Sequence, residues 1–182
     1  MKLEKTNLED CFILSPKVFE DERGTFSETF NAQNFLEQTG IAVTFVQDNQ
    51  STSKYGVVRG LHFQTGVHGQ TKLVRVVKGS ALDVVVDLRK GSPSFGKSFS
   101  IVLSGENKKQ LFVPRGFAHG FSVLEDDTVF AYKCDAYYNK ESERGIVYND
   151  ATLATDWHLS SNAMIISKKD LELPTFAAIK PE

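Results

Sequence analysis

Short apolar runs separated by turn-forming residues occupy the chain from about residue 43 to residue 147. The runs at 82–88, 98–103 and 128–134 are rich in β-branched and aromatic residues and partly alternate between apolar and polar positions, as is typical of β-strands. Turn formers separate them at 78–80, 90–93, 104–107 and 125–127. This rhythm predicts an all-β fold, either a sandwich or a barrel.

The two ends of the chain carry different patterns. A short helix is predicted at 32–38, with Asn31 as its N-cap and Gly40 at its C-terminal end. The tail from Asp150 onward has a mixed pattern that predicts small helical segments. Because the sequence contains no repeat, low-complexity tract or linker, we expect one domain over residues 1–182.

Extended runs near the N-terminus, at 11–14 and 25–30, lie outside the main series of strands. All-β domains protect their sheet edges by closure or by pairing with a second subunit. These runs are suited to that pairing, so we expect a homodimer.

Composition narrows the classes of function. The chain has 182 residues and a formal net charge of −2, so nothing suggests a nucleic-acid or membrane surface. No apolar run is long enough to cross a bilayer, and the N-terminus lacks the layout of a secretory signal. Cys11 and Cys134 have no CxxC spacing and do not suggest a disulfide scaffold. We therefore expect a cytoplasmic protein with reduced thiols.

The segment 56–79 has the glycine-bounded, β-branched pattern of a hairpin but contains unusually many polar residues. These are Arg59, His62, Gln70, Lys72 and Arg75. A plain core strand would carry Val or Ile at such positions, so the segment is a candidate wall of a binding site.

A metal site is one interpretation of the histidines. The spacing of Pro114, Gly116 and His119 resembles the second motif of cupin jelly rolls, where such a histidine often binds a metal. However, a single His62 replaces the usual His-x-His pair, and Gln70 and Lys72 stand where a carboxylate ligand is expected. An ammonium repels a cation and an amide is a weak ligand. The sequence therefore argues against a metal.

The alternative is metal-free acid–base chemistry. His62 is suited by its ordinary pKa to be a general base, and a buried carboxylate would hold its tautomer. Lys72 would stabilise an enolate oxygen, and Tyr132 would serve as an acid. Taken alone, His62 is equally compatible with a structural role, and Tyr132 alone fits a core or rim position better than a catalytic one.

Two arginines and a polar cluster are candidates for ligand contacts. Arg23 and Arg59 each precede a glycine, and arginine pairs are suited to phosphate; the competing interpretation is a pair of surface salt bridges. The cluster 47–51 follows a predicted strand at 43–46. It is either an ordinary turn or a hydrogen-bonding wall for a sugar or a base.

Taken together, these motifs resemble the dTDP-4-dehydrorhamnose 3,5-epimerase family of metal-free, cupin-like enzymes. The similar segments keep their order along most of the chain: FEDERGTFSETF (19–30), FVQDNQSTSKYGVVRGLHFQ (45–64), QTKLVRVVKGSALDVVVDLRKGSPSFG (70–96), QLFVPRGFAHGFSVLEDDTVFAYKCDAYYN (110–139) and ERGIVYND (143–150). The resemblance implies a jelly roll that inverts C3 and C5 of dTDP-4-dehydro-6-deoxy-α-D-glucose through enolates. It implies no cofactor and no metal.

Residue roles follow from the same resemblance. It implies that His62 removes the proton, that Tyr132 returns one from the opposite face of the sugar, and that Lys72 stabilises the enolate oxygen. His119 would be a second polar contact to the sugar. In the C-terminal stretch, Asp170 would orient the base.

The resemblance also implies a set of binding contacts. Lys169 would contact the ligand, Arg23 and Arg59 would bind phosphate, and Tyr138 would stack on thymine. Further ligand contacts would come from Glu28, Gln47, Asn49 and Glu143. In this family, N-terminal residues cross to the neighbouring subunit, so Arg23 and Glu28 would serve the partner's site.

Several hypotheses remain open from the residues alone. Asp83 is a second candidate carboxylate for the cavity. The same acid–base residues would serve an enzyme that inverts a single carbon of another dTDP-4-keto sugar. The sequence is also compatible with a non-catalytic cupin that binds sugar nucleotides and with a metal-dependent cupin.

Overall fold

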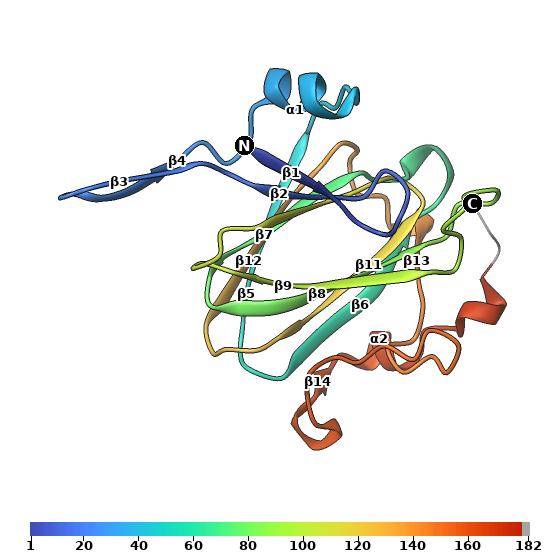
Figure 1. The fold of residues 1–182 in the computed structure, drawn as a ribbon. Helices are drawn as coiled ribbons and strands as arrows, with labels where there is room; N and C mark the ends of the chain where they lie inside the picture. The colour runs from blue at the N-terminus through green and yellow to red at the C-terminus, as the bar shows by residue number, and fades with distance from the viewer. Residues whose placement is uncertain (180–182) are drawn as a thin grey trace.

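Two antiparallel sheets face each other in the computed structural model, which describes residues 1–179 (Figure 1). Sheet 1 has, in spatial order, strands β1 (Lys2–Lys5), β2 (Phe12–Ser15), β10 (Gln110–Val113), β7 (Lys72–Lys78), β12 (Thr128–Cys134) and β5 (Gln47–Ser53). Sheet 2 has β13 (Glu143–Gly145), β6 (Val57–Gln64), β11 (Phe117–Val123), β8 (Ser80–Asp87) and β9 (Ser98–Ser104), with β14 (Ile165–Ile166) parallel to β6. The chain crosses repeatedly between the sheets, which confirms the predicted cupin-like jelly roll.

The predicted hairpin at 56–79 is wrong. β6 pairs with β11 and β13 in sheet 2, whereas β7 pairs with β10 and β12 in sheet 1. The 3-10 helix η1 (Gly66–His68) lies in the crossing between them. The two polar strands are therefore opposite walls of the sandwich. The local sequence pattern cannot distinguish the two arrangements, because a loop that connects two sheets and a loop that closes a hairpin contain the same turn-forming residues.

Strand β8 is buried along its whole length. Its Ala81 and Val85 belong to the core between the sheets, whereas Leu82, Val84 and Val86 pack in a second cluster with Trp157. A strand covered on both faces does not need to alternate in polarity. This explains why the run at 82–88 has apolar residues on both faces, with Asp83 and Asp87 as its polar positions.

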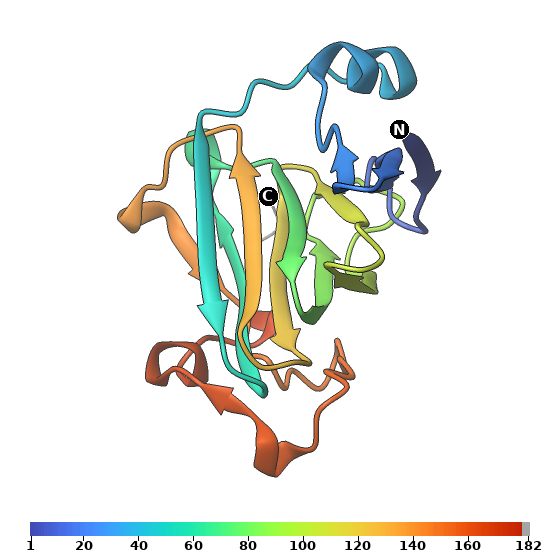
Figure 2. The ribbon, with the colours of Figure 1, turned by 90° about the vertical axis from the view of Figure 1, so that its left-hand side faces the viewer.

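The outer face of sheet 2 is covered by the C-terminal segment. This segment includes the 3-10 helices η3 (Ser161–Ala163) and η4 (Phe176–Ala178) and the short helix α2 (Lys168–Leu171). In Figure 2 it lies at the end of the sandwich opposite the N-terminal helix. The small helical segments predicted for the tail are confirmed.

Helix α1 (Ala32–Thr39) packs near one end of sheet 1 (Figure 1). Asn31 caps it, with its side chain accepting from the Asn34 N–H, and Gly40 closes it at φ 72°. A left-handed conformation of this kind is accessible to glycine at little cost. The fully buried Phe35 joins Phe112 and other apolar residues beneath the helix.

The predicted strand at 43–46 is wrong. Residues 41–46 belong to no strand, although the Val46 N–H donates to the Cys134 carbonyl at 2.9 Å, and the strand begins at Gln47. Val43 and Phe45 pack against the cluster beneath α1, which explains their apolar character. The polar cluster 47–51 is thus part of β5, the edge strand of sheet 1, rather than a turn.

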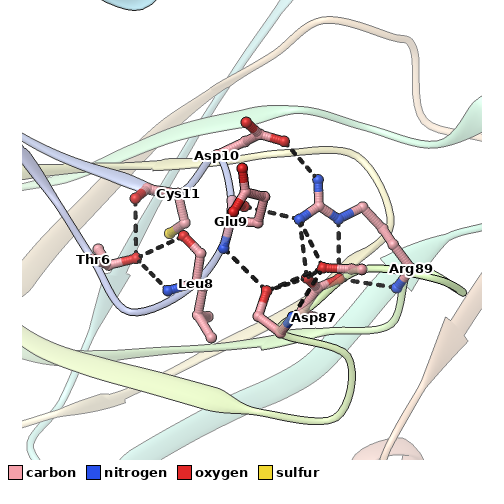
Figure 3. Close-up of polar contacts among 9 residues, drawn as sticks. Thr6, Leu8, Glu9, Asp10, Cys11, Asp87 and Arg89 are labelled. Atoms are coloured by element: carbon pink, nitrogen blue, oxygen red, sulfur yellow. Dashed lines mark hydrogen bonds and ion pairs between the residues drawn. The ribbon is translucent and has the colours of Figure 1, made fainter.

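A buried polar network ties the N-terminus to the barrel (Figure 3). Asp87 is fully buried and accepts hydrogen bonds from Arg89, Ser92 and Ser94, at 2.6–3.0 Å for the side-chain donors. Arg89 also bonds Asp10 Oδ2 at 3.0 Å and the Glu9 carbonyl at 2.8 Å. The loop after β8 therefore holds the turn between β1 and β2.

Strands β3 (Val18–Asp21) and β4 (Gly24–Ser27) form a separate hairpin. It projects from the sandwich, as the left side of Figure 1 shows. Phe19 and Phe26 on this hairpin are 51% and 70% exposed. Exposed aromatic side chains on a projecting arm are suited to contact another protein surface.

Candidate active site

A cavity of about 660 Å³ lies between the two sheets. Its volume is in the range of small-molecule sites. Most of the residues predicted to serve a site line it: Asn49, Arg59, His62, Lys72, His119, Tyr132, Tyr138, Glu143, Lys169 and Asp170. The cavity therefore collects residues from most of the length of the chain.

Gln47 lies behind the cavity wall rather than on it. Its side-chain oxygen accepts from the Tyr138 backbone N–H at 3.0 Å, and its amide donates to Asn49 at 3.1 Å. Within this chain it thus positions two lining residues.

Arg23 and Glu28 lie outside the cavity. Arg23 is on the turn between β3 and β4 and pairs with Asp21, and Glu28 accepts from Asn31 at 3.2 Å. Arg75 also points away, because it alternates with Lys72 and Val74 along β7 and lies in a separate pocket on the other face of sheet 1. The cavity of a single chain therefore does not contain all the residues that were predicted to contact the ligand.

His62 and Asp170 form a hydrogen-bonded pair at the cavity wall. His62 Nε2 lies 2.7 Å from Asp170 Oδ1, and the Gly60 N–H donates to Asp170 Oδ2 at 3.4 Å. Burial raises the pKa of the Asp170 carboxyl, but the hydrogen bond and charge of His62, with the Gly60 N–H, outweigh burial and leave that pKa below its usual value. A carboxylate at Nε2 fixes the N–H there and leaves the Nδ1 lone pair as the basic atom.

Local structure holds this pair in place. His62 is in the middle of β6, hydrogen-bonded between β11 and β13. Asp170 is in α2, where its backbone N–H donates to the N-cap Ser167 at 3.1 Å. The His62 side chain keeps 30% of its surface exposed, against 6% for Asp170. The imidazole is therefore accessible to a ligand while its partner is shielded.

Lys72 and Tyr132 come from the opposite sheet. Lys72 Nζ lies 5.9 Å from the centroid of the Tyr132 ring. Burial raises the pKa of the Tyr132 hydroxyl and keeps it protonated. Burial also lowers the pKa of Lys72, against the opposing influence of Cys134, Asp83 and Glu143. The cavity thus has an imidazole on one wall and a lysine amino group and a phenol on the other.

His119 forms a second pair with Asp83. Its Nε2 lies 2.8 Å from Asp83 Oδ2, and both side chains are almost completely buried. Burial lowers the pKa of His119 despite the adjacent carboxylate, so its imidazole is neutral near pH 7. Asp83 thus lies against His119, and Asp170 against His62.

A chain of polar contacts crosses the rim of the cavity. The Tyr138 hydroxyl donates to Glu143 Oε2 at 2.8 Å, and Lys169 Nζ donates to the same oxygen at 2.6 Å. Arg59 bonds Ser53 at 3.3 Å on a neighbouring part of the wall. These exposed cationic and aromatic groups are suited to the charged and planar parts of a nucleotide.

Gln50 and Ser51 line the cavity from β5, in agreement with the interpretation of 47–51 as a hydrogen-bonding wall. Other lining residues were missed by sequence reasoning, among them Ser167 at the N-cap of α2. The spacing of Ser167 and Asp170 is a capping pattern that could have located this helix. No local signal marks Ile165 and Ile166, which contribute an apolar part of the wall.

The donor set of the cavity does not fit a metal ion. Both histidines use Nε2 to bind an aspartate, and the side chain over the Tyr132 ring is a buried lysine rather than a carboxylate. Among residues 1–179, no three His, Cys, Asp or Glu side chains are grouped as a metal site requires.

Neither helix in this part of the chain has the length and apolar character needed to cross a bilayer.

Comparisons with known proteins show which family the chain resembles. A family model described as dTDP-4-dehydrorhamnose 3,5-epimerase matches residues 5–178. The chain is 50% identical over 175 residues to dTDP-4-dehydrorhamnose 3,5-epimerase of Escherichia coli (strain K12), and the match covers 96% of this chain and 94% of the relative.

Solved structures extend the similarity to three dimensions. The crystal structure of dTDP-4-dehydrorhamnose 3,5-epimerase from Elizabethkingia anophelis NUHP1 matches with a TM-score of 0.94 and 55% identity, covering 97% of each chain. The dTDP-6-deoxy-D-glucose-3,5-epimerase of Legionella pneumophila Philadelphia 1, in complex with dTDP-4-keto-L-rhamnose, matches with a TM-score of 0.94 and 46% identity, covering 98% of this chain and 94% of that one. The chain therefore belongs to the dTDP-4-dehydrorhamnose 3,5-epimerase family.

Proposed function

We propose that the protein is a dTDP-4-dehydrorhamnose 3,5-epimerase, which inverts C3 and C5 of dTDP-4-dehydro-6-deoxy-α-D-glucose to give dTDP-4-dehydro-β-L-rhamnose. The observation that carries the proposal is the His62–Asp170 pair, 2.7 Å apart, in one cavity with Lys72 and Tyr132. Family membership over residues 5–178 supports the choice of substrate.

The chemistry needs a base and an acid on opposite faces of the sugar. C3 and C5 both flank the C4 ketone, so loss of either proton gives an enolate. His62 Nδ1 takes the proton, and Asp170 stabilises the resulting imidazolium. The Lys72 ammonium stabilises the enolate oxygen, and the Tyr132 hydroxyl protonates the carbon from the other side. The assignment is supported by the origin of His62 in sheet 2 and of Tyr132 in sheet 1.

The nucleotide is assigned to the rim. Arg59 and Lys169 would bind the diphosphate, and Tyr138 would stack on thymine. His119, Asn49 and Glu143 would complete the contacts, and Gln47 would act through Asn49 and Tyr138. On binding, Lys169 would leave its ion pair with Glu143 and form an ion pair with the phosphate instead. Both contacts are charge-assisted hydrogen bonds of an exposed side chain.

The active unit is a homodimer in this proposal. Arg23 and Glu28 do not line the cavity of their own chain. The β3–β4 hairpin, between β2 and α1, projects from the sandwich with Phe19 and Phe26 exposed. In a dimer this arm would cover its aromatic side chains and bring both polar residues to the partner's rim. Sedimentation velocity should give a dimer at micromolar concentration. A monomer that is fully active would rule the arrangement out.

A cytoplasmic location completes the proposal. Cys11 and Cys134 are both buried and unpaired, which is suited to a reducing compartment. The sugar nucleotide that the cavity would take is likewise an intracellular type of metabolite.

Incubation with the dTDP-4-keto-6-deoxy sugar in D₂O tests the function. NMR should show deuterium at both C3 and C5 of the product and inverted couplings at both centres. Deuterium at one carbon would instead indicate a single-carbon epimerase. Tight dTDP binding without exchange at either carbon would indicate a non-catalytic binding protein.

A further inference from the structure

The segment 135–139 links β12 to the 3-10 helix η2 (Lys140–Ser142) at the rim of the cavity. Its five residues, all in the described part of the chain, belong to no helix or strand. It carries Tyr137 and Tyr138, which are 70% and 52% exposed. Because no ladder or helix holds this segment, its backbone groups need other partners if the exposed rings are to keep one position.

Two glutamine side chains supply such partners on either side of Tyr138. Gln70 Nε2 donates to the Ala136 carbonyl at 2.9 Å, and Gln64 Oε1 accepts from the Asn139 N–H at 3.0 Å. Gln64 is the last residue of β6 in sheet 2, and Gln70 lies just before β7 in sheet 1. The segment is therefore anchored to both sheets by side-chain amides.

The partners fix the orientation of both amides. A backbone N–H can only donate a hydrogen bond, and a carbonyl can only accept one. Gln64 must therefore present its oxygen to Asn139, and Gln70 must present its nitrogen to Ala136. Two residues of the same type thus have opposite roles, one as an acceptor and the other as a donor.

Tyr138 is itself held at two further points. Its backbone N–H donates to Gln47 Oε1 at 3.0 Å, and its hydroxyl donates to Glu143 Oε2 at 2.8 Å. The ring is half exposed while the backbone and the hydroxyl on either side of it are fixed. An aromatic face that is held in place before a ligand arrives loses less conformational freedom when the ligand stacks on it.

We propose that Gln64 and Gln70 are positioning residues, which hold the segment 135–139 so that the Tyr138 ring is a preformed stacking surface for the base of a nucleotide. The identity of the stacked group rests on the proposed function, whereas the support of the segment by the two glutamines does not. Neither glutamine touches the base; both act through the backbone beside Tyr138.

Substitution by glutamate distinguishes the two roles. A carboxylate at position 64 still accepts from the Asn139 N–H, whereas a carboxylate at position 70 has no N–H to donate and repels the Ala136 carbonyl. Methionine has a similar length but neither group, so it removes either contact. We therefore expect Gln64→Glu to resemble the wild type, and Gln64→Met, Gln70→Glu and Gln70→Met to be impaired.

Calorimetric titrations with dTDP and with pyrophosphate, which has no base, measure this impairment. The ratio of the Kd for dTDP to the Kd for pyrophosphate should rise about tenfold in the three impaired variants, as expected for the loss of one hydrogen bond. It should keep the wild-type value in Gln64→Glu. The ratio cancels the effect of an added charge on the diphosphate, and a general loss of structure would weaken both ligands alike.

The matched controls are Gln38→Met and Gln38→Glu. Gln38 is exposed on α1 and does not line the cavity, so both variants should keep the wild-type ratio. An unchanged ratio in Gln64→Met and Gln70→Glu would overturn the proposal. So would a rise in Gln64→Glu as large as that in Gln64→Met.

Amide hydrogen exchange tests the support of the segment without a ligand. The Asn139 N–H should be protected in the wild type and in Gln64→Glu, and should exchange about tenfold faster in Gln64→Met. Equal rates in the three proteins would show that Gln64 does not hold the segment.

The outcomes separate this proposal from the proposed function. If the wild type binds no dTDP, the proposed function and the stacking surface both fail, while the exchange rates still decide whether Gln64 positions the segment. If Gln64→Met does not fold, Gln64→Glu and Gln70→Glu still have opposite expected ratios, and equal ratios in these two variants would overturn the proposal.

Discussion

His62 and His119 are register partners on neighbouring strands β6 and β11, and each binds an aspartate through Nε2. They differ in exposure: the His62 side chain is 30% exposed and that of His119 is 6% exposed. The half-buried His62 imidazole is accessible to a ligand, whereas burial lowers the pKa of His119 and keeps its imidazole neutral near pH 7. The same His–Asp pair thus occurs on two neighbouring strands, with His62 placed as the proposed base and His119 as a neutral side chain in the cavity wall.

His62→Asn should abolish catalysis without affecting the nucleotide. Removing the base should lower the rate of deuterium exchange at C3 and C5 by about a thousandfold, while the Kd for dTDP changes little because His62 faces the sugar. Exchange followed by NMR and calorimetric titration with dTDP check the two parts. His158→Asn is the matched control, since His158 is exposed at φ 54°, where asparagine is tolerated. Equal exchange in the two variants would contradict the role of His62.

Tyr132→Phe should separate proton removal from inversion. His62 still forms the enolate, so deuterium should appear in recovered substrate, while net inversion falls by about a hundredfold or more. Tyr148→Phe, outside the cavity, should behave as wild type. Full turnover by Tyr132→Phe would show that another group returns the proton.

Arg59→Ala should weaken binding rather than chemistry. The guanidinium would contact a part of the substrate that does not change during the reaction, so KM should rise by about tenfold or more with kcat nearly constant. Steady-state kinetics check this, with Arg115→Ala as a control because Arg115 pairs with Asp135 away from the cavity. A fall in kcat at unchanged KM would place Arg59 at the reacting carbons instead.

Asp87→Asn should destabilise the fold in a pH-dependent way. Burial opposes ionisation of Asp87, but hydrogen bonds from Arg89, Ser92 and Ser94 outweigh it, so its pKa is lowered. The stabilisation is therefore complete above the unfolded pKa of about 3.9 and is lost as pH falls toward the folded value. We expect the variant to lose about 2 kcal/mol at pH 7 and less at pH 3.

Urea unfolding at fixed protein concentration measures this difference. Asp127→Asn is the control, because Asp127 is exposed at φ 54°. A loss for Asp87→Asn that is the same at pH 3 and pH 7 would mean that the network does not depend on the Asp87 charge.

The sequence was informative where local chemistry decides structure. Asn31 and Gly40 bounded helix α1 correctly because caps satisfy backbone groups at fixed positions. The spacing of Pro114, Gly116 and His119 located the turn before β11. The polar positions on apolar strands, Lys72 and His62 above all, indicated a cavity.

The sequence was uninformative where pairing is between distant strands. The segment 56–79 resembled a hairpin because local pattern does not say whether β6 and β7 share a sheet. The run at 43–46 looked like a strand because its apolar residues pack beneath α1 without a ladder. The pairing of Asp83 with His119 spans 36 residues, and no local spacing could assign it.

The most direct test of the account is a crystal structure with the substrate or its product nucleotide bound. We predict that the hexose lies in the 660 Å³ cavity, with His62 Nδ1 and the Tyr132 hydroxyl on opposite faces of the ring, each about 3–3.5 Å from C3 or C5, and Lys72 Nζ at the C4 oxygen. A hexose bound away from these three groups, or with His62 and Tyr132 on the same face, would contradict it.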